Sequence, residues 1–93
     1  MIENPNVRVE VIAIFTHNVP MSQCGTKIYK VKWNGREHRV ITFGLHHIEK
    51  RGNILHHIFS VCTPTVNFKL SLNTKTLVWK LEGVSDAAKY LSS

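Results

Sequence analysis

The dipeptide Asn34-Gly35, set between two alternating runs, constrains the fold of this chain more than any other feature. Before it, Tyr29, Val31 and Trp33 alternate with lysines, and after it a second strand-like run covers residues 37–43. Asn-Gly tolerates the positive φ angles of a tight type I′ turn, which joins neighbouring antiparallel strands. The sequence therefore predicts a β-hairpin at this point.

The same period of two recurs along much of the chain. Further runs of this kind are found at residues 7–15, 54–62, 66–72 and 77–82. Turn-forming residues separate them, and the stretch from Gly44 to Gly52 is predicted to be a connection. Residues 1–6 are expected to fray, and Ser85 or Asp86 is expected to cap a short helix over residues 84–92.

These patterns predict one mainly-β domain covering residues 1–93. We expect a six-stranded antiparallel meander that forms a small SH3-like or OB-like open barrel or a curled sheet, with a short C-terminal helix. Four aromatic side chains share faces with apolar residues and are predicted to lie in its core: Tyr29, Trp33, Phe68 and Trp79.

The chain is strongly basic, with 12 Lys and Arg against 6 Asp and Glu and a formal net charge of +6. Such a charge attracts polyanions. The strand assignment predicts a basic surface made of Lys30, Lys32, Arg36, Lys69 and Lys80. We therefore expect a small binding module that holds nucleic acid through phosphate contacts, without sequence specificity. The alternative partner is an acidic protein, docked at an open sheet edge.

Histidine is enriched, and four of the six histidines form the doublets His46-His47 and His56-His57. If the chain turns about Arg51 and Gly52, His47 lies near His56 and His46 lies near His57. His47 and His56 are then the candidate zinc ligands, although packing roles are favoured and we expect no metal or cofactor.

The same doublets, with Lys50 or Arg51, contain the acid, base and cation that a metal-independent ribonuclease needs. This enzyme activity is the second alternative. No catalytic motif stands out in the sequence, so we expect a binding protein rather than an enzyme.

The longest apolar run, from Val11 to Phe15, is far too short to cross a bilayer, and the first residues lack the pattern of a signal peptide. Without an export signal, Cys24 and Cys62 are expected to be reduced thiols. The sequence therefore predicts a cytoplasmic protein with no membrane partner, and it leaves a homo-oligomer open.

The stretch from Val31 to Arg36, continued by Arg39-Val40 and by residues 44–47, resembles small uncharacterised bacterial all-β proteins that contain a domain of unknown function. Residues 57–61 and the strand around Trp79 fit the same pattern. The resemblance covers roughly residues 27–86 and implies a small β fold. It implies no functional residue.

Overall fold

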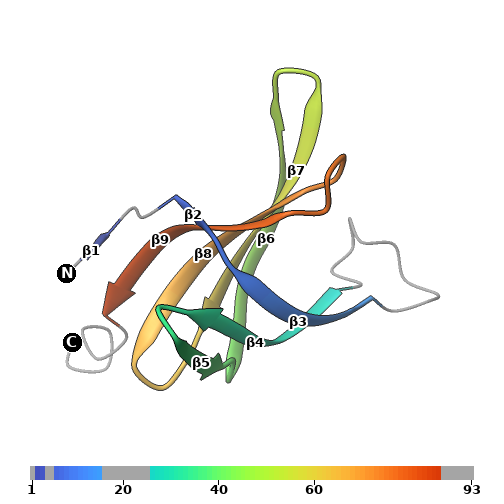
Figure 1. The fold of residues 1–93 in the computed structure, drawn as a ribbon. Coiled ribbons are helices and arrows are strands. Elements are labelled where there is room, and N and C mark those ends of the chain that lie inside the picture. Colours follow the sequence, from blue (N-terminus) through green and yellow to red (C-terminus); the bar gives the residue numbers. More distant parts are fainter. Residues whose placement is uncertain (1, 4–5, 16–25, 87–93) are drawn as a thin grey trace.

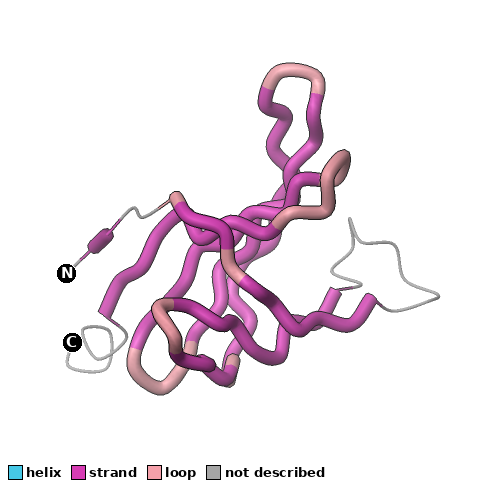
Figure 2. Tube along the Cα trace, in the orientation of Figure 1, coloured by secondary structure: helices cyan, strands magenta, loops and turns pink. Residues whose placement is uncertain are grey.

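The computed structural model describes residues 2–3, 6–15 and 26–86, and every regular element among them is an antiparallel strand (Figures 1 and 2). The strands are β1 (Ile2–Glu3), β2 (Val7–Arg8), β3 (Glu10–Phe15), β4 (Thr26–Trp33), β5 (Arg36–Arg39), β6 (Thr42–Arg51), β7 (Ile54–Cys62), β8 (Val66–Asn73) and β9 (Trp79–Asp86). The predicted mainly-β class is confirmed.

The strands form two sheets that do not close on each other. The large sheet has the order β1-β9-β8-β7-β6, with β2 also pairing with β9, and the small sheet has the order β3-β4-β5. Strands β6 to β9 therefore pair in chain order, as predicted for a meander. Figure 1 shows the small sheet crossing one face of the large sheet, and the β6–β7 hairpin extending beyond it.

The chain passes between the sheets at two corners. At the first corner, Val9 separates β2 from β3, and its N–H donates to the Trp79 carbonyl oxygen over 3.1 Å. At the second, the Val40 N–H donates to the Tyr29 oxygen in the small sheet, while the Ile41 N–H donates to the Cys62 oxygen in the large sheet, each over 2.8 Å. Backbone pairing thus continues across both corners and holds the two sheets together.

The core lies between the facing sides of the two sheets. Its buried members come from β4, β7, β8 and β9: Ile28, Val31, Phe59, Val61, Phe68, Leu70, Leu72, Leu81 and Val84. Trp33 and Trp79 pack against this cluster, and the Trp33 ring meets Phe68 edge-on at 5.8 Å between centroids. The core positions predicted for Phe68 and the two tryptophans agree with this packing.

The hairpin predicted at Asn34-Gly35 is confirmed. Both residues have positive φ angles, 57° and 76°, and Trp33 pairs directly with Arg36. These are the angles that a type I′ turn requires at its two central positions.

The predicted connection from Gly44 to Gly52 is wrong, because nearly all of it belongs to the ten-residue strand β6. The predicted strand over residues 37–43 is instead divided between β5 and β6 by the second corner. The pairing of β6 with β7 shifts register between Phe43 and His46, which breaks the alternation that would have marked a strand. The structure accordingly has more strands than the six predicted.

The two ends of the described chain also differ from the predictions. Ile2 and Glu3, expected to fray, form β1 and pair with Ser85 and Val84 of β9. Residues 84–86 of the predicted helix, including both proposed capping residues, therefore extend β9. Its remaining residues, 87–92, lie outside the described part of the chain.

Candidate nucleic-acid interface

The five basic residues predicted to form one surface lie on two different sheets. Lys30 and Lys32 lie on β4 and Arg36 begins β5, all in the small sheet. Lys69 and Lys80 lie on β8 and β9 of the large sheet. The prediction of a single continuous lysine/arginine face is therefore not matched by the strand arrangement.

The exposed face of the small sheet has a charged end where cations and carboxylates alternate. Lys32 lies directly opposite Glu37, and its Nζ is 4.0 Å from Glu10 Oε2 on β3. Lys30 lies opposite Arg39, and its Nζ is 3.6 Å from Glu37 Oε1. All of these side chains are well exposed, so such pairs contribute only about 0–1 kcal/mol each and open readily for a ligand.

A shallow groove of about 350 Å³ lies beside these pairs, at the second corner. Three cations line it, Lys27, Lys30 and Arg39, together with the exposed ring of Tyr29. The ammonium of Lys27 is 5.3 Å from the centre of that ring. Neither Lys27 nor Arg39 is within ion-pair distance of a carboxylate among the described residues. The groove therefore combines uncompensated positive charge with an accessible aromatic face.

Tyr29 is the residue that the sequence pattern misplaced. It was predicted to share the core face of Val31 and Trp33, but it is 40% exposed. The cause is a register shift in the pairing of β3 with β4: Ile12 pairs with Lys30 and Ala13 pairs with Ile28, which leaves Tyr29 as an extra residue. An extra residue of this kind turns the neighbouring side chains to the other face. A bulge depends on the pairing with the neighbouring strand, so the alternation of residues within β4 could not predict that Tyr29 is exposed.

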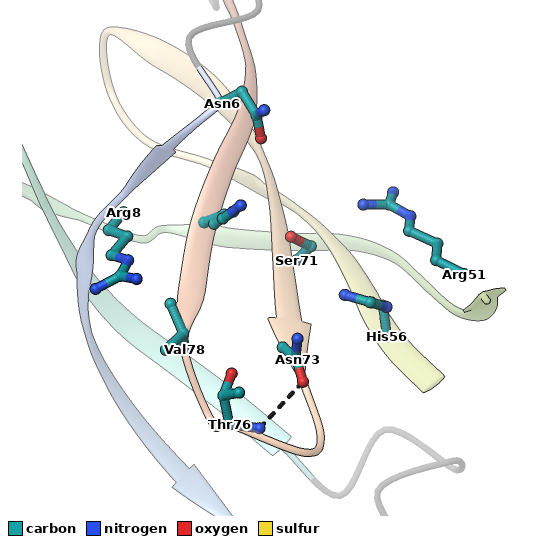
Figure 3. Close-up of a pocket in the computed structure, with 9 residues that line it drawn as sticks. Asn6, Arg8, Arg51, His56, Ser71, Asn73, Thr76 and Val78 are labelled. Atoms are coloured by element: carbon teal, nitrogen blue, oxygen red, sulfur yellow. Dashed lines mark hydrogen bonds between the residues drawn. The ribbon is translucent and has the colours of Figure 1, made fainter. Parts of the chain in front are cut away.

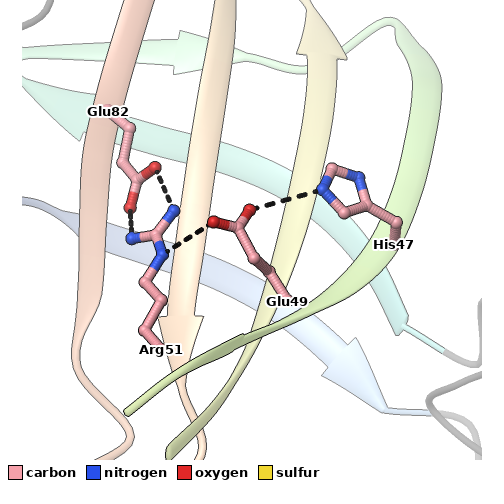
Figure 4. Close-up of polar contacts among 4 residues, drawn as sticks. All are labelled: His47, Glu49, Arg51 and Glu82. Carbon is pink, nitrogen blue, oxygen red and sulfur yellow. Dashed lines mark hydrogen bonds and ion pairs between the residues drawn. The ribbon is translucent and has the colours of Figure 1, made fainter.

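The outer face of the large sheet carries a connected chain of polar side chains (Figure 4). Arg51 donates two hydrogen bonds to Glu82, at 2.5 and 2.9 Å, and a third to Glu49 at 3.1 Å. Glu49 in turn lies 3.6 Å from His47 Nε2. The network spans the sheet from β6 to β9, over the intervening strands β7 and β8.

Arg51 determines the protonation of the network. Its hydrogen bonds lower the pKa of Glu82 to about 2, against a smaller opposing effect of burial. They also lower the pKa of Glu49, and the two carboxylates raise the pKa of Arg51 itself. Much of the Arg51 charge is thus neutralised within the sheet.

The structure confirms the predicted approach of His46 to His57 but not that of His47 to His56. The turn places His47 opposite Ile58 and His56 opposite Glu49, so the two candidate zinc ligands are not opposite each other. No group of three potential metal-binding side chains occurs within the described residues.

His46 and His57 do come together, on the inward side of the same hairpin. His46 Nε2 and His57 Nδ1 are 2.8 Å apart, within hydrogen-bonding distance, and the two rings are nearly parallel with 5.0 Å between centroids. Burial is the main cause that lowers the pKa of each, and the neighbouring histidine, His47 for His46 and His46 for His57, lowers it further. The ring of His46 also stacks on Phe59, at 4.6 Å between centroids. The pair is therefore packed against the core rather than placed beside a row of cations.

Comparison with known proteins gives no match to this chain, whether by family model, curated protein or solved structure. In the part of the chain that the structure describes, no helix has the length and apolar character needed to cross a membrane. The functional argument therefore depends on the geometry of the two sheet faces.

Proposed function

We propose that this chain is a small binding module of the SH3-like or OB-like open-barrel kind that holds single-stranded nucleic acid in the groove beside Tyr29. The observation that supports this is the exposed Tyr29 ring among Lys27, Lys30 and Arg39. Small β modules that bind single strands combine a positively charged groove with aromatic side chains on which bases stack.

Each part of the groove has a separate task in this proposal. Lys27 and Arg39 contact phosphates, and Lys30 joins them once its weak pair with Glu37 opens. The Tyr29 ring stacks on one unpaired base, an interaction worth about 1–3 kcal/mol. A duplex has no free base face to offer, so the module prefers single strands. Stacking accepts every base, so sequence preference is weak.

The proposal is tested by fluorescence anisotropy with labelled single-stranded RNA, single-stranded DNA and duplex DNA, at about 0.05 and 0.2 M salt. Tyr29→Ala should weaken single-strand binding by about 5- to 150-fold, which corresponds to the loss of one stacked base. Tyr29→Phe keeps the ring and should bind nearly as well as the original chain.

The charge contribution is tested separately with Arg39→Gln. It should weaken binding similarly for all sequences and reduce the salt slope by about 1, as expected for one lost phosphate contact. The matched control is Lys50→Gln, which removes one charge from the β6–β7 hairpin, away from the groove, and should change binding little.

A polyglutamate probe, which stands in for an acidic protein, distinguishes that alternative partner from nucleic acid. Polyglutamate that binds as tightly as single-stranded DNA, with Tyr29→Ala having no effect on either probe, would contradict the nucleic-acid proposal. Such a result would favour the acidic-protein alternative, because side-chain carboxylates provide charge without a base to stack.

A further inference from the structure

A second polar pocket, of about 440 Å³, lies on the outer face of the large sheet (Figure 3). Its lining includes three cationic residues, Arg8 on β2, Arg51 at the end of β6 and Lys80 on β9. His56 and Asn73 lie at the same surface, and none of these side chains belongs to the groove beside Tyr29. Its volume is within the range of pockets that hold small molecules.

Two of the cations face each other without a counter-charge. Arg8 on β2 is directly opposite Lys80 on β9. Like charges at directly opposite positions of an antiparallel pair destabilise a sheet. Neither residue forms an ion pair with a carboxylate of the described chain. An anion placed between the two would replace this repulsion with two attractions.

Arg51 lines the pocket, and hydrogen bonds to two carboxylates hold its guanidinium in place. Glu82 and Glu49 accept three hydrogen bonds from its guanidinium. A guanidinium has five N–H donors, so two remain for a ligand. Because its geometry is already fixed by these acceptors, Arg51 loses little conformational freedom when a ligand binds.

Asn73 and His56 add unused hydrogen-bonding capacity to the lining. The side-chain oxygen of Asn73 accepts from the N–H groups of Lys75 and Thr76, over 2.8 and 3.1 Å, which fixes the amide and leaves its NH₂ group as a donor. The Nδ1 atom of His56 is buried and has no hydrogen-bond partner. Buried polar atoms are normally paired, so an orphan atom at a pocket calls for an explanation.

We propose that this pocket binds a phosphate monoester of nucleotide size, with the phosphate dianion between Arg8 and Lys80. A dianion matches the two uncompensated charges, and the amide of Asn73 and the free N–H groups of Arg51 donate to the phosphate oxygens or to polar groups of the ester. The ligand is a free mononucleotide or the 5′-terminal phosphate of a nucleic-acid strand. Both sources present the same phosphate chemistry.

The site is tested by isothermal titration calorimetry and thermal melting with inorganic phosphate, adenosine 5′-monophosphate and adenosine. The monophosphate should bind and raise the melting temperature, adenosine should do neither, and inorganic phosphate should bind more weakly. Lys80→Gln should reduce affinity for the monophosphate at least tenfold. The same substitution should leave the melting temperature of the free protein unchanged or raise it, because it removes the repulsion with Arg8.

Arg8→Gln provides a second variant on a short exposed strand and should give the same two effects. Lys50→Gln is the matched control and should leave binding of the monophosphate unchanged. The proposal is overturned if neither phosphate compound binds at about 10 mM in low salt, if adenosine binds as well as its monophosphate, or if both pocket variants bind normally.

Oligonucleotides with a 5′-phosphate or a 5′-hydroxyl separate the two sources. A preference for the phosphorylated end that Lys80→Gln abolishes identifies the strand terminus, and equal binding of both identifies the free mononucleotide. Tyr29→Ala should not change binding of the monophosphate. The proposal for the groove and the proposal for this pocket can therefore be refuted independently of each other.

Discussion

Replacing Glu82 with Gln tests whether the Arg51 network stabilises the outer face of the large sheet. Gln keeps the shape of the side chain and one acceptor oxygen, but it removes the negative charge that balances Arg51. The Glu82 side chain is only 14% exposed, so water replaces the lost charge poorly. We expect the folded state to lose stability at neutral pH.

The magnitude follows from the pKa of the carboxyl. Its pKa falls from an ordinary value of 4.5 to about 2 in the folded state. At about 1.4 kcal/mol per pKa unit, the charged form contributes at most roughly 3.5 kcal/mol to the free energy of unfolding. Arg51 is 38% exposed and partly screened by water, which reduces the expected loss to about 1–2 kcal/mol.

The same pKa fixes the pH range of the effect. The unfolded chain binds the proton near pH 4.5 and the folded chain only near pH 2, so this contribution is complete above pH 4.5 and is lost as the pH falls toward 2. Glu82→Gln should therefore flatten the stability profile in that interval.

Urea unfolding of both chains at pH 7 and at steps from pH 5 to 2 measures the effect. Glu37→Gln is the matched control, because it removes a carboxylate from an exposed pair with Lys30 and should change stability by less than about 0.5 kcal/mol. A Glu82→Gln loss no larger than that of the control, or a pH profile like that of the original chain, would refute the reasoning.

Three further substitutions test the fold. Burial lowers the pKa values of His46 and His57 below 6.5, so the unfolded chain takes up protons first and stability should fall as the pH drops below 6.5. His57→Phe should reduce this slope in urea titrations, and the contributions of His46 and of His38, whose pKa is also lowered, should remain. Gly44→Ala would place a methyl group 3.0 Å from the Ser60 carbonyl oxygen and should cost about 1–3 kcal/mol in chemical denaturation, whereas an unchanged midpoint would show that the strands separate easily there. Gly35→Ala meets no atom within 4 Å but retains a φ of 76°, so a loss of about 1 kcal/mol with an unchanged circular dichroism spectrum is expected, and no loss would mean that the turn changes type.

The parts of the fold that could be predicted from the sequence are those governed by local rules. Asn34-Gly35 encodes its own backbone angles, and the alternation in β7 and β8 places Phe59 and Phe68 correctly in the core. The extent of β6 could not be predicted, because its register shift and the approach of Gly44 to Ser60 depend on a partner strand. The pairing of Ile2–Glu3 with β9 likewise depends on residues more than 80 positions away.

The candidate sites depended even more on long-range pairing. The alternation of lysines with apolar residues was enough to predict that Lys30 is exposed. The exposure of Tyr29, in contrast, results from one bulge. Arg39 joins the groove only because the chain leaves the small sheet immediately after it. The position of Arg8 beside Lys80 follows from the pairing of β2 with β9. No local pattern encodes that pairing.

The carboxylates, more than the number of cations, decide which positive charges are available to a ligand. Within the described residues, Glu10 and Glu37 lie beside Lys32 and Lys30, and Glu49 and Glu82 surround Arg51. Of the cations outside these ion pairs, Lys27 and Arg39 line the groove, and Arg8 and Lys80 line the pocket. The cations of the groove lie on the small sheet and those of the pocket on the large sheet, so the excess positive charge of the chain is not gathered on one surface. Substitutions at one surface should therefore leave binding at the other intact, which is the additivity expected of sites without shared contacts.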